Sequence, residues 1–448
     1  MVEIVAQKAL LDDGWAENVR ISIENGRIGK IERSSAVDSS AEPAEIVISG
    51  MPNLHSHAFQ RAMAGLAEVR GPSSDSFWSW RSLMYQLALS ITPDQIEAVA
   101  AQLYMEMLEA GFTRVGEFHY LHHDKDGMPY ANIAEHAERI AAASAATGIH
   151  LTLLPVFYAH SNFGGLPPDD GQRRFINSLD SFSRLMDASS KVVERLDNSQ
   201  LGLALHSLRA VSPDELQNLV QRHGQGPIHI HIAEQIKEVN DCISWSGARP
   251  VEWLLSNADV DQRWCLIHAT HMTESETTAM AATGAVAGLC PITEANLGDG
   301  IFPGSTFLES KGRFGIGSDS NISISVAHEL RQLEYSQRLG QRARNVIADP
   351  GGSTGRKLFD HALHGGAAAL GTNAAIREGS VADLVSLRPE SVFARSDDQL
   401  LDNWIFGDGV RVDSVWTAGT KCVASGRHID RENIVKRFGQ AMRTLVGQ

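Results

Sequence analysis

Eight short apolar segments, separated by longer segments with helical periodicity, constrain the fold of this chain most strongly. The apolar segments cover residues 46–54, 112–118, 150–157, 201–206, 227–233, 264–269, 285–290 and 313–318. The longer segments include 93–111 and 132–148, and the first of them begins with a threonine cap and a first-turn proline, Thr92–Pro93. Strands that alternate with helices in this way predict an α/β fold of the (β/α)8 type, a TIM-like barrel.

The two ends of the chain are patterned differently from its middle. Residues 17–32 alternate between apolar and polar side chains around a glycine-containing turn, and residues 379–387 return to a strand-like run. We therefore expect residues 1–49 and 371–448 to form one small composite β-sandwich domain from both ends of the chain. The barrel domain, residues 50–370, would interrupt it.

The net charge and the cysteines limit what the protein binds and where it works. The chain carries 39 Lys and Arg against 54 Asp and Glu, a formal net charge of −15, which argues against nucleic acid as a partner. The same charge does not attract an anionic substrate, so such a substrate would need arginines in the pocket itself. The four cysteines have no C-x-x-C spacing, and neither a signal peptide nor a membrane-spanning apolar stretch is evident. We expect a cytoplasmic protein with reduced thiols.

Polar residues recur at the ends of the predicted barrel strands. His55 and His57 are two residues apart on the first strand, so their side chains project from the same face. His231, His268 and Asp319 stand at the ends of the fifth, sixth and eighth strands. Barrel active sites lie where strands end in loops. Three histidines and a carboxylate suit Zn²⁺ with one open position, and leave one histidine over. Iron or manganese would also fit such ligands.

These residues, in this order along the chain, resemble the signature of the amidohydrolase superfamily. The resemblance implies that His55, His57, His231 and Asp319 hold a metal, with His268 beside it. The fourth predicted strand, residues 201–211, has no lysine. Superfamily members with two metals use a carboxylated lysine there, so the resemblance favours one Zn²⁺ per subunit. The motif His231-x-Ala233-Glu234 is similar to that of the deaminases of this branch.

A closer resemblance is to the formimidoylglutamate deiminase family. The segments that carry it are residues 50–65, 77–81, 116–123, 206–211 and 231–235. It implies that N-formimino-L-glutamate is hydrolysed to N-formyl-L-glutamate and ammonia, a step of histidine degradation. It also implies five substrate contacts, namely Gln60, Arg81, Tyr120, His206 and Arg209. Within the resemblance, Asp319 acts as the general base, His268 polarises the group under attack, and Glu234 protonates the leaving ammonia.

The sequence offers two arginine side chains that suit the charge of the implied substrate. It is a small dianion, and a desolvated carboxylate without a partner is costly. Arginine binds a carboxylate with two parallel hydrogen bonds, so Arg81 and Arg209 suit its two acidic groups.

Other polar residues receive no catalytic role at this stage. His229 shares a face with His231 but lies one layer deeper, and we interpret it as structural. Arg61 is expected to be a surface or structural residue, His122 and His123 loop residues, and Glu117 and His119 stay unassigned. Segment 161–173, rich in glycine and proline, is expected to be a loop and is a candidate lid.

Three alternatives stay open. The nearest is another deaminase with one zinc, acting on a purine, pyrimidine or triazine ring, although paired arginines disfavour a neutral ring. The second is a hydrolase of a cyclic amide, which segment 206–211 fits less well. The third is a non-catalytic barrel, which the complete set of ligands and acid–base residues disfavours. We expect a homodimer.

Overall fold

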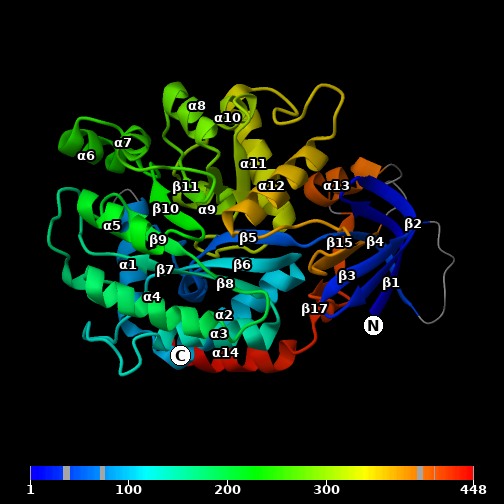
Figure 1. The fold of residues 1–448 in the computed structure, drawn as a ribbon, viewed down its shortest axis with the longest axis horizontal. Helices are drawn as coiled ribbons and strands as arrows, with labels where there is room; N and C mark the ends of the chain where they lie inside the picture. The colour runs from blue at the N-terminus through cyan, green and yellow to red at the C-terminus, as the bar shows by residue number, and fades with distance from the viewer. Residues whose placement is uncertain (1, 34–40, 71–75, 391–396, 408, 447–448) are drawn as a thin grey trace.

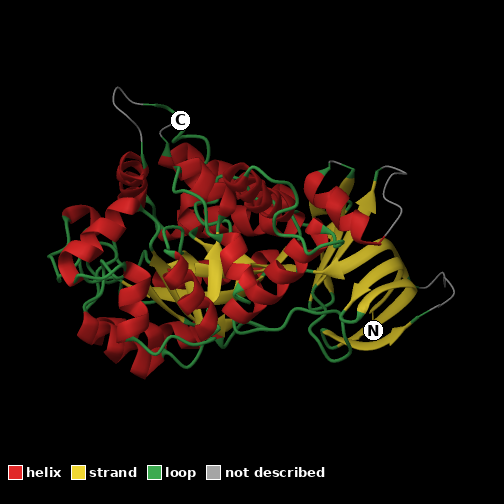
Figure 2. Cartoon of the chain, turned by 90° about the horizontal axis from the view of Figure 1, so that it is seen from above, coloured by secondary structure: helices red, strands yellow, loops and turns green. Residues whose placement is uncertain are grey.

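The chain folds into a barrel surrounded by helices, with a smaller sheet at one end (Figure 1). The computed structural model describes residues 2–33, 41–70, 76–390, 397–407 and 409–446. Seen from above, helices ring the barrel strands, and the small sheet stands apart from them (Figure 2). Among the described helices, none is long and apolar enough to span a membrane.

Eight parallel strands form the barrel in the order of the sequence. They are β5 (Met51–Ser56), β6 (Phe112–His119), β7 (His150–Phe157), β9 (Leu203–Ser207), β10 (Ile228–Ile232), β11 (Trp264–His268), β12 (Val286–Leu289) and β13 (Arg313–Ile316). The short β8 (Gln200–Leu201) also pairs with β7. The barrel closes just beyond β13, where Ser318 and Asp319 donate backbone hydrogen bonds to the carbonyl of His55. The predicted (β/α)8 fold is confirmed.

Helices cover the outside of the barrel and follow its strands. Those of the barrel region are α1 (Phe77–Ser90), α2 (Pro93–Glu109), α3 (Glu135–Thr147), α4 (Leu179–Val193), α5 (Pro213–His223), α6 (Ile236–Ser246), α7 (Pro250–Asn257), α8 (Glu274–Thr283), α9 (Pro291–Leu297), α10 (Gly304–Glu309), α11 (Val326–Gln341) and α12 (Thr354–Ala369). Thr92 caps α2 as its sequence predicts, because its hydroxyl accepts a hydrogen bond from Gln95 N. A short 3₁₀ helix, Ala58–Met63, follows β5.

The two chain ends meet in one eight-stranded sheet. Its order is β17 (Arg427–His428), β16 (Thr420–Ala424), β15 (Val410–Thr417), β14 (Leu384–Pro389), β4 (Glu42–Ser49), β1 (Val2–Leu11), β2 (Gly14–Glu24) and β3 (Arg27–Glu32). The hairpin of β2 and β3 folds back on the C-terminal part, where Ile28 N donates to Ser380 O and Ala382 N to Gly26 O. The sheet therefore encloses a small core of its own, which includes Ile21 and Trp416.

One predicted strand is in fact two. Segment 46–54 was expected to be a single barrel strand, but it divides at Gly50 between β4 of the small sheet and β5 of the barrel. Gly50 N bonds to Asp383 O at 2.9 Å, and a Cβ on Gly50 would lie 2.2 Å from Thr113 Cγ2. The chain thus crosses between the two sheets at a position too crowded for a side chain.

The C-terminal range also holds helices. Residues 371–448 contain α13 (Asp397–Phe406) and α14 (Arg431–Leu445) as well as strands. Helix α14 lies along barrel helix α2 (red in Figure 1), and Arg437 pairs with Glu97 of α2 at 2.5 Å. The domain boundaries at residues 49/50 and 370/371 stay a prediction.

Residues 161–173 form a loop after β7, as expected, broken only by the 3₁₀ turn Asp170–Gln172. Its end is anchored, because Gln172 is fully buried. Whether the loop moves as a lid stays a prediction.

Candidate active site and metal centre

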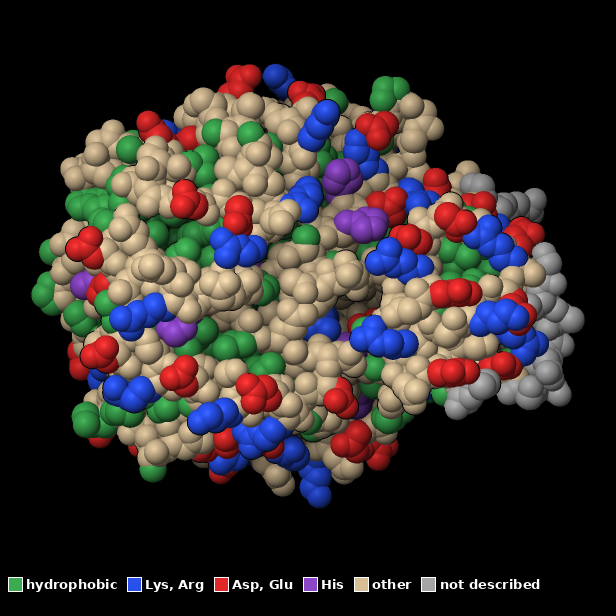
Figure 3. All heavy atoms as spheres, viewed as in Figure 1, with side chains coloured by type: hydrophobic (Ala, Val, Ile, Leu, Met, Phe, Trp, Pro, Cys, Tyr) green, Lys and Arg blue, Asp and Glu red, His purple; other side chains and the backbone are tan. Residues whose placement is uncertain are grey.

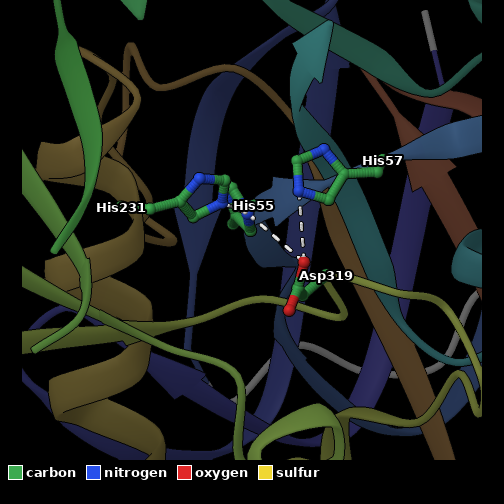
Figure 4. Close-up of side chains that lie close together, drawn as sticks. All are labelled: His55, His57, His231 and Asp319. Carbon is green, nitrogen blue, oxygen red and sulfur yellow. Dashed lines mark hydrogen bonds and ion pairs between the residues drawn. The ribbon is translucent and has the colours of Figure 1, made fainter. Parts of the chain in front are cut away.

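Four of the predicted residues converge at the carboxyl ends of the barrel strands (Figure 4). The ligand atoms of His55, His57, His231 and Asp319 all lie within 4.8 Å of one another. Asp319 Oδ1 is 3.5 Å from His55 Nε2 and 3.3 Å from His57 Nε2. His55 Nε2 and His231 Nε2 are 3.0 Å apart. All four side chains are buried.

The hydrogen bonds behind these histidines orient their lone pairs inward. His57 Nδ1 bonds to Phe118 O at 3.0 Å, and His231 Nδ1 bonds to His206 O at 2.9 Å. A ring that donates from Nδ1 presents an unprotonated Nε2 to the centre. Burial lowers the pKa of His55 to about 3, which keeps that ring neutral as well. Three imidazoles and one carboxylate that face one another fit a divalent cation.

The backbone turns sharply where these side chains leave the barrel. Ala233, His268 and Asp319 have φ angles of 51°, 66° and 44°. Residues other than glycine seldom adopt this left-handed region, and such strain concentrates at functional sites. The strand ends are therefore bent to aim their side chains into the barrel mouth.

His268 lies beside the four converging residues, among three carboxylates. Its Nε2 is 3.8 Å from Glu234 Oε1 and 3.8 Å from Asp319 Oδ2. Its Nδ1 is 3.2 Å from Glu294 Oε1, and that oxygen also accepts a hydrogen bond from Cys290 N at 2.8 Å. Glu294 therefore fixes the ring of His268 so that Nε2 faces Glu234 and Asp319.

These groups hold different protonation states. Burial would lower the pKa of His268, but the charges of Glu234 and Asp319 and the bond to Glu294 raise it to about 10. Burial raises the pKa of Glu234 to about 7. Burial would raise the pKa of Asp319 too, but His55 and His57 hold it well below its usual range. At neutral pH the site thus combines an ionised carboxylate, Asp319, with a protonated imidazole, His268, and with Glu234 close to its midpoint.

A pocket opens over this centre and is lined by all five predicted substrate contacts. They are Gln60, Arg81, Tyr120, His206 and Arg209. Gln60 Nε2 donates to the Tyr120 hydroxyl at 2.9 Å, while Gln60 Oε1 is buried without a partner in the described structure. The ring of His206 packs against Tyr158, with centroids 4.4 Å apart. The rest of the lining is largely aromatic and includes Phe77, Trp80 and Phe175.

The two arginines of the pocket have no acidic partner among the described residues. Arg209 is 6% exposed, and its Nε is buried without a hydrogen bond in the described structure. Arg81 bonds to tyrosine hydroxyls instead of a carboxylate. On the face shown in Figure 3, acidic and basic side chains are interspersed over most of the surface. Arg81 and Arg209 thus place positive charge in the lining of the pocket, beside the four converging residues.

Several residues of the site were not predicted from the sequence. Tyr158 directly follows β7, and Glu294 lies in α9 just beyond β12, so the rule that strand ends build barrel sites could have found both. Tyr85 lies one helical turn after Arg81 on α1 and lines the same pocket. The spacing i to i+4 was the available signal there.

The remaining histidines and acids near the site make structural contacts. His229 Nε2 bonds to Ala369 O at 2.7 Å, which agrees with its interpretation as structural. Glu117 accepts hydrogen bonds from Ala58 N and the Tyr104 hydroxyl, and burial raises its pKa to about 7.

Arg61, predicted to be a surface or structural residue, and His122 and His123, predicted to be loop residues, also make structural contacts. Arg61 binds Glu106 and the carbonyls of Asn321 and Ile322, so it holds the loop after Asp319. His122 and His123 are buried loop residues that bond to backbone carbonyls. His119 is buried beside them, and its Nε2 has no partner in the described structure.

Comparison with known proteins gives the family. Residues 46–422 match the amidohydrolase family model, and residues 1–45 match the model described as formimidoylglutamate deiminase HutF, N-terminal domain. The formimidoylglutamate deiminase of Pseudomonas aeruginosa is 51% identical over an alignment of 453 positions that covers all of both chains. The chain belongs to the formimidoylglutamate deiminases of the amidohydrolase family. The resemblance predicted from its motifs is confirmed.

Solved structures of amidohydrolases agree with this fold. The amidohydrolase of Brucella melitensis is 57% identical and superposes over the whole of both chains with a TM-score of 0.98. An adenosine deaminase from Xanthomonas campestris, solved with bound zinc, superposes with a TM-score of 0.81 at 20% identity, covering 100% of this chain and 99% of that one. At that identity the likeness shows the fold alone.

Proposed function

We propose that this amidohydrolase hydrolyses N-formimino-L-glutamate to N-formyl-L-glutamate and ammonia. The Pseudomonas aeruginosa relative has this activity in its name. In the geometry, the observation that carries the proposal is the pair Arg81 and Arg209, which lie in the pocket above the centre and form no ion pair with any carboxylate of the described residues. A buried guanidinium needs an anion, and this substrate brings two carboxylates.

The residues of the site have separate tasks in this reaction. A divalent ion held by His55, His57, His231 and Asp319 would supply hydroxide near neutral pH, because it lowers the pKa of water to about 7. Asp319, ionised at neutral pH, accepts the proton that the attacking water gives up. His268, protonated and 3.8 Å from Asp319, polarises the group under attack and stabilises the tetrahedral intermediate. Glu234, with its pKa near 7, passes a proton to the nitrogen that leaves as ammonia.

Zinc, the quaternary structure and the pathway belong to the same proposal. We assign one Zn²⁺ per subunit on the ligand set, and metal analysis of the purified protein distinguishes it from iron or manganese. The proposed activity corresponds to a step of histidine degradation in the cytoplasm. A homodimer is expected, and light scattering at several protein concentrations measures it.

A ring deaminase is the second candidate. The aromatic side chains of the pocket, Phe77, Trp80 and Phe175 among them, could stack on a purine, pyrimidine or triazine. Against it, such a ring would leave both arginines without an anion.

The deciding experiment follows ammonia and the organic product from N-formimino-L-glutamate with metal-loaded protein. Release of ammonia together with N-formylglutamate would support the proposed reaction and the role of Glu234 in protonating the leaving nitrogen. Release of glutamate together with formamide would confirm the substrate but contradict the role of Glu234, because the bond to the glutamate nitrogen would have broken instead. No turnover by the metal-loaded protein, with turnover of a ring substrate, would favour the second candidate.

A further inference from the structure

The two strand ends that carry the acid–base groups are bent in a way that needs support. Ala233, just before Glu234, has a φ angle of 51°, and His268 has one of 66°. Residues other than glycine seldom adopt this left-handed region, and such bends persist only where neighbouring groups hold the backbone. The side chains that the bends aim come within 3.8 Å of each other, from Glu234 Oε1 to His268 Nε2. The groups that hold the bends therefore set this distance.

The bend at Glu234 is held first by its own neighbourhood. Glu238, in the first turn of α6, accepts hydrogen bonds from Ala233 N and Glu234 N, both at 3.2 Å. From the loop after β11, His271 N donates to Ala233 O at 3.0 Å. These bonds fix the backbone before and at Glu234, but not the residue that follows it.

The residue that follows Glu234 is held by a buried acid from a distant segment. Gln235 Nε2 donates a hydrogen bond to Asp299 Oδ1. Asp299 is 4% exposed and does not line the pocket in the described structure, so it does not itself contact a bound substrate. The turn that carries it is closely packed, because a Cβ on Gly300 would lie 3.1 Å from Thr270 Cγ2. Asp299 is therefore a firm support for the Gln235 side chain.

The same short segment also holds His268. Glu294, in α9, lies 3.2 Å from His268 Nδ1. Helix α9 is capped by Gly298, which has a φ angle of 72°. The chain then turns back, so that Asp299 N donates to Glu294 O at 2.9 Å. The two acids that support the two bends are thus tied directly to each other.

We propose that Asp299 is a positioning residue, which holds Glu234 in place through Gln235. A single segment, residues 291–299, then sets the distance between Glu234 and His268. This inference deepens the proposed function and rests on it, because that function assigns proton transfer to Glu234 and polarisation of the amidine to His268.

Asparagine can replace Asp299 in this role, whereas alanine cannot. Burial and the charge of Glu234 raise the pKa of Asp299 to about 9, so this acid is protonated at neutral pH. Because Oδ1 accepts the hydrogen bond from Gln235, the proton belongs to Oδ2. Asparagine has the same shape, the same acceptor toward Gln235, and N–H donors in place of the O–H. Alanine has neither the acceptor nor the donor.

The first test compares the two replacements in metal-loaded protein with N-formimino-L-glutamate. Asp299→Ala should lower kcat about 10–100-fold, because a small displacement of a reacting group suffices for such a loss. KM should stay within about twofold and the metal content should not change. Asp299→Asn should recover most of kcat, and Asp259→Ala, at an exposed loop position, is the matched control. Equal losses for alanine and asparagine, or no loss for alanine, would overturn the inference.

The second test removes the other partner of the same hydrogen bond. Gln235→Leu should lower kcat to a similar extent as Asp299→Ala. The double variant Gln235→Leu/Asp299→Ala should be no worse than either single variant, because one bond is lost in all three. Gln217→Leu, exposed on α5, is the control. Losses that multiply in the double variant would show that the two residues act independently, and would overturn the inference.

Hydrogen exchange separates this inference from the proposed function. The backbone amides of Ala233 and Glu234 are bonded to Glu238, so their exchange reports how firmly the bend is held. In Asp299→Ala, residues 231–238 should exchange faster than in wild type, and in Asp299→Asn they should not, whatever the enzyme hydrolyses. Unchanged exchange in Asp299→Ala would overturn the inference. The expected exchange pattern, together with no turnover of N-formimino-L-glutamate by the wild type, would overturn the proposed function alone.

Discussion

At the scale of single residues, the site separates ligands from acid–base groups that lie almost as close. His268 Nε2 is 3.8 Å from Asp319 Oδ2, yet its other nitrogen is held by Glu294 rather than by a backbone carbonyl. The carboxylates around it raise its pKa to about 10, so it carries a proton at neutral pH, and a protonated imidazole cannot bind a metal. His57, by contrast, bonds to a carbonyl through Nδ1 and keeps Nε2 free.

His268→Asn should therefore lose activity but keep its metal. We expect kcat to fall by about 10²–10⁴-fold, the range for an acid–base group, with one metal per chain retained. Asp319→Asn should lose both activity and metal, because Asp319 serves in both roles. Steady-state kinetics and metal analysis on the same samples make the comparison. His364→Asn, an exposed position, is the control. A His268 variant within threefold of wild type would remove His268 from the mechanism.

At the scale of elements, helix α12 packs on the barrel through glycines. A Cβ on Gly365 would lie 1.8 Å from the carbonyl oxygen of Phe314 in β13, and one on Gly315 would lie 2.6 Å from Gly366 N. The helix backbone thus rests directly on the strand that leads to Asp319.

Gly365→Ala should accordingly destabilise the fold, because the helix or the strand must move to admit one methyl group. We expect a loss of about 3 kcal/mol or more in the free energy of unfolding, at or above the upper end of overpacking costs. Gly439→Ala on α14 is the matched control, since its Cβ would meet nothing closer than 3.7 Å. That change should be neutral or stabilise by up to about 1 kcal/mol. Urea unfolding measures both, and equal stability of the two variants would contradict the close packing.

Helix α14 packs on the barrel through apolar side chains such as Ile434 and also pairs with α2 through Arg437 and Glu97, so part of its docking should depend on pH. Burial would raise the pKa of Glu97, but Arg437 and Arg139 outweigh it and hold the pKa below 4.5. A carboxyl group with a lowered pKa in the folded state stabilises the fold when ionised. This contribution is present above pH 4.5 and disappears as the pH falls through the lowered pKa.

Glu97→Gln should then cost about 0.5–1 kcal/mol at pH 7, the value of a largely solvent-screened network. The difference from wild type should shrink as the pH is lowered toward 4. Urea unfolding at several pH values tests this, with the exposed Glu309→Gln as control. A difference that does not change with pH would show that shape, not charge, holds α14.

The sequence predicts best those elements whose apolar and polar residues follow a regular pattern. The eight barrel strands are apolar runs bounded by polar ends, and the same rule places His55, His57, His231, His268 and Asp319 at one mouth. The division of segment 46–54 at Gly50 could not be predicted in this way, because a glycine inside an apolar run does not show that the chain changes sheets there. The positions of Tyr85 and Gln172 could not be predicted either. Tertiary packing places α1 and the loop 161–173, and it leaves no periodic pattern in the local sequence.

At the scale of the whole molecule, the metal centre lies on the seam that closes the barrel. His55 and His57 belong to the first strand and its end, and Asp319 follows the last. The end of β5 and the segment after β13 are joined by an isolated β-bridge between Ser56 and Asp319. Backbone bonds such as His57 N to Asp319 O support it. A metal bound by His55 and His57 on the first strand and by Asp319 after the last would therefore also hold the two edges of the barrel sheet together.

Removal of the metal should loosen this seam as well as abolish activity. A ligand that binds only the folded state at a thousandfold excess over its Kd stabilises by about 4 kcal/mol, so chelation should lower Tm by several degrees. Hydrogen exchange should increase in residues 51–57 and 313–321 more than in β1 and β2, because the small sheet has a core of its own. Zinc added back should restore Tm, exchange protection and activity together. Chelated protein with unchanged Tm and exchange would mean that hydrogen bonds alone close the barrel, and that the four residues serve only the chemistry.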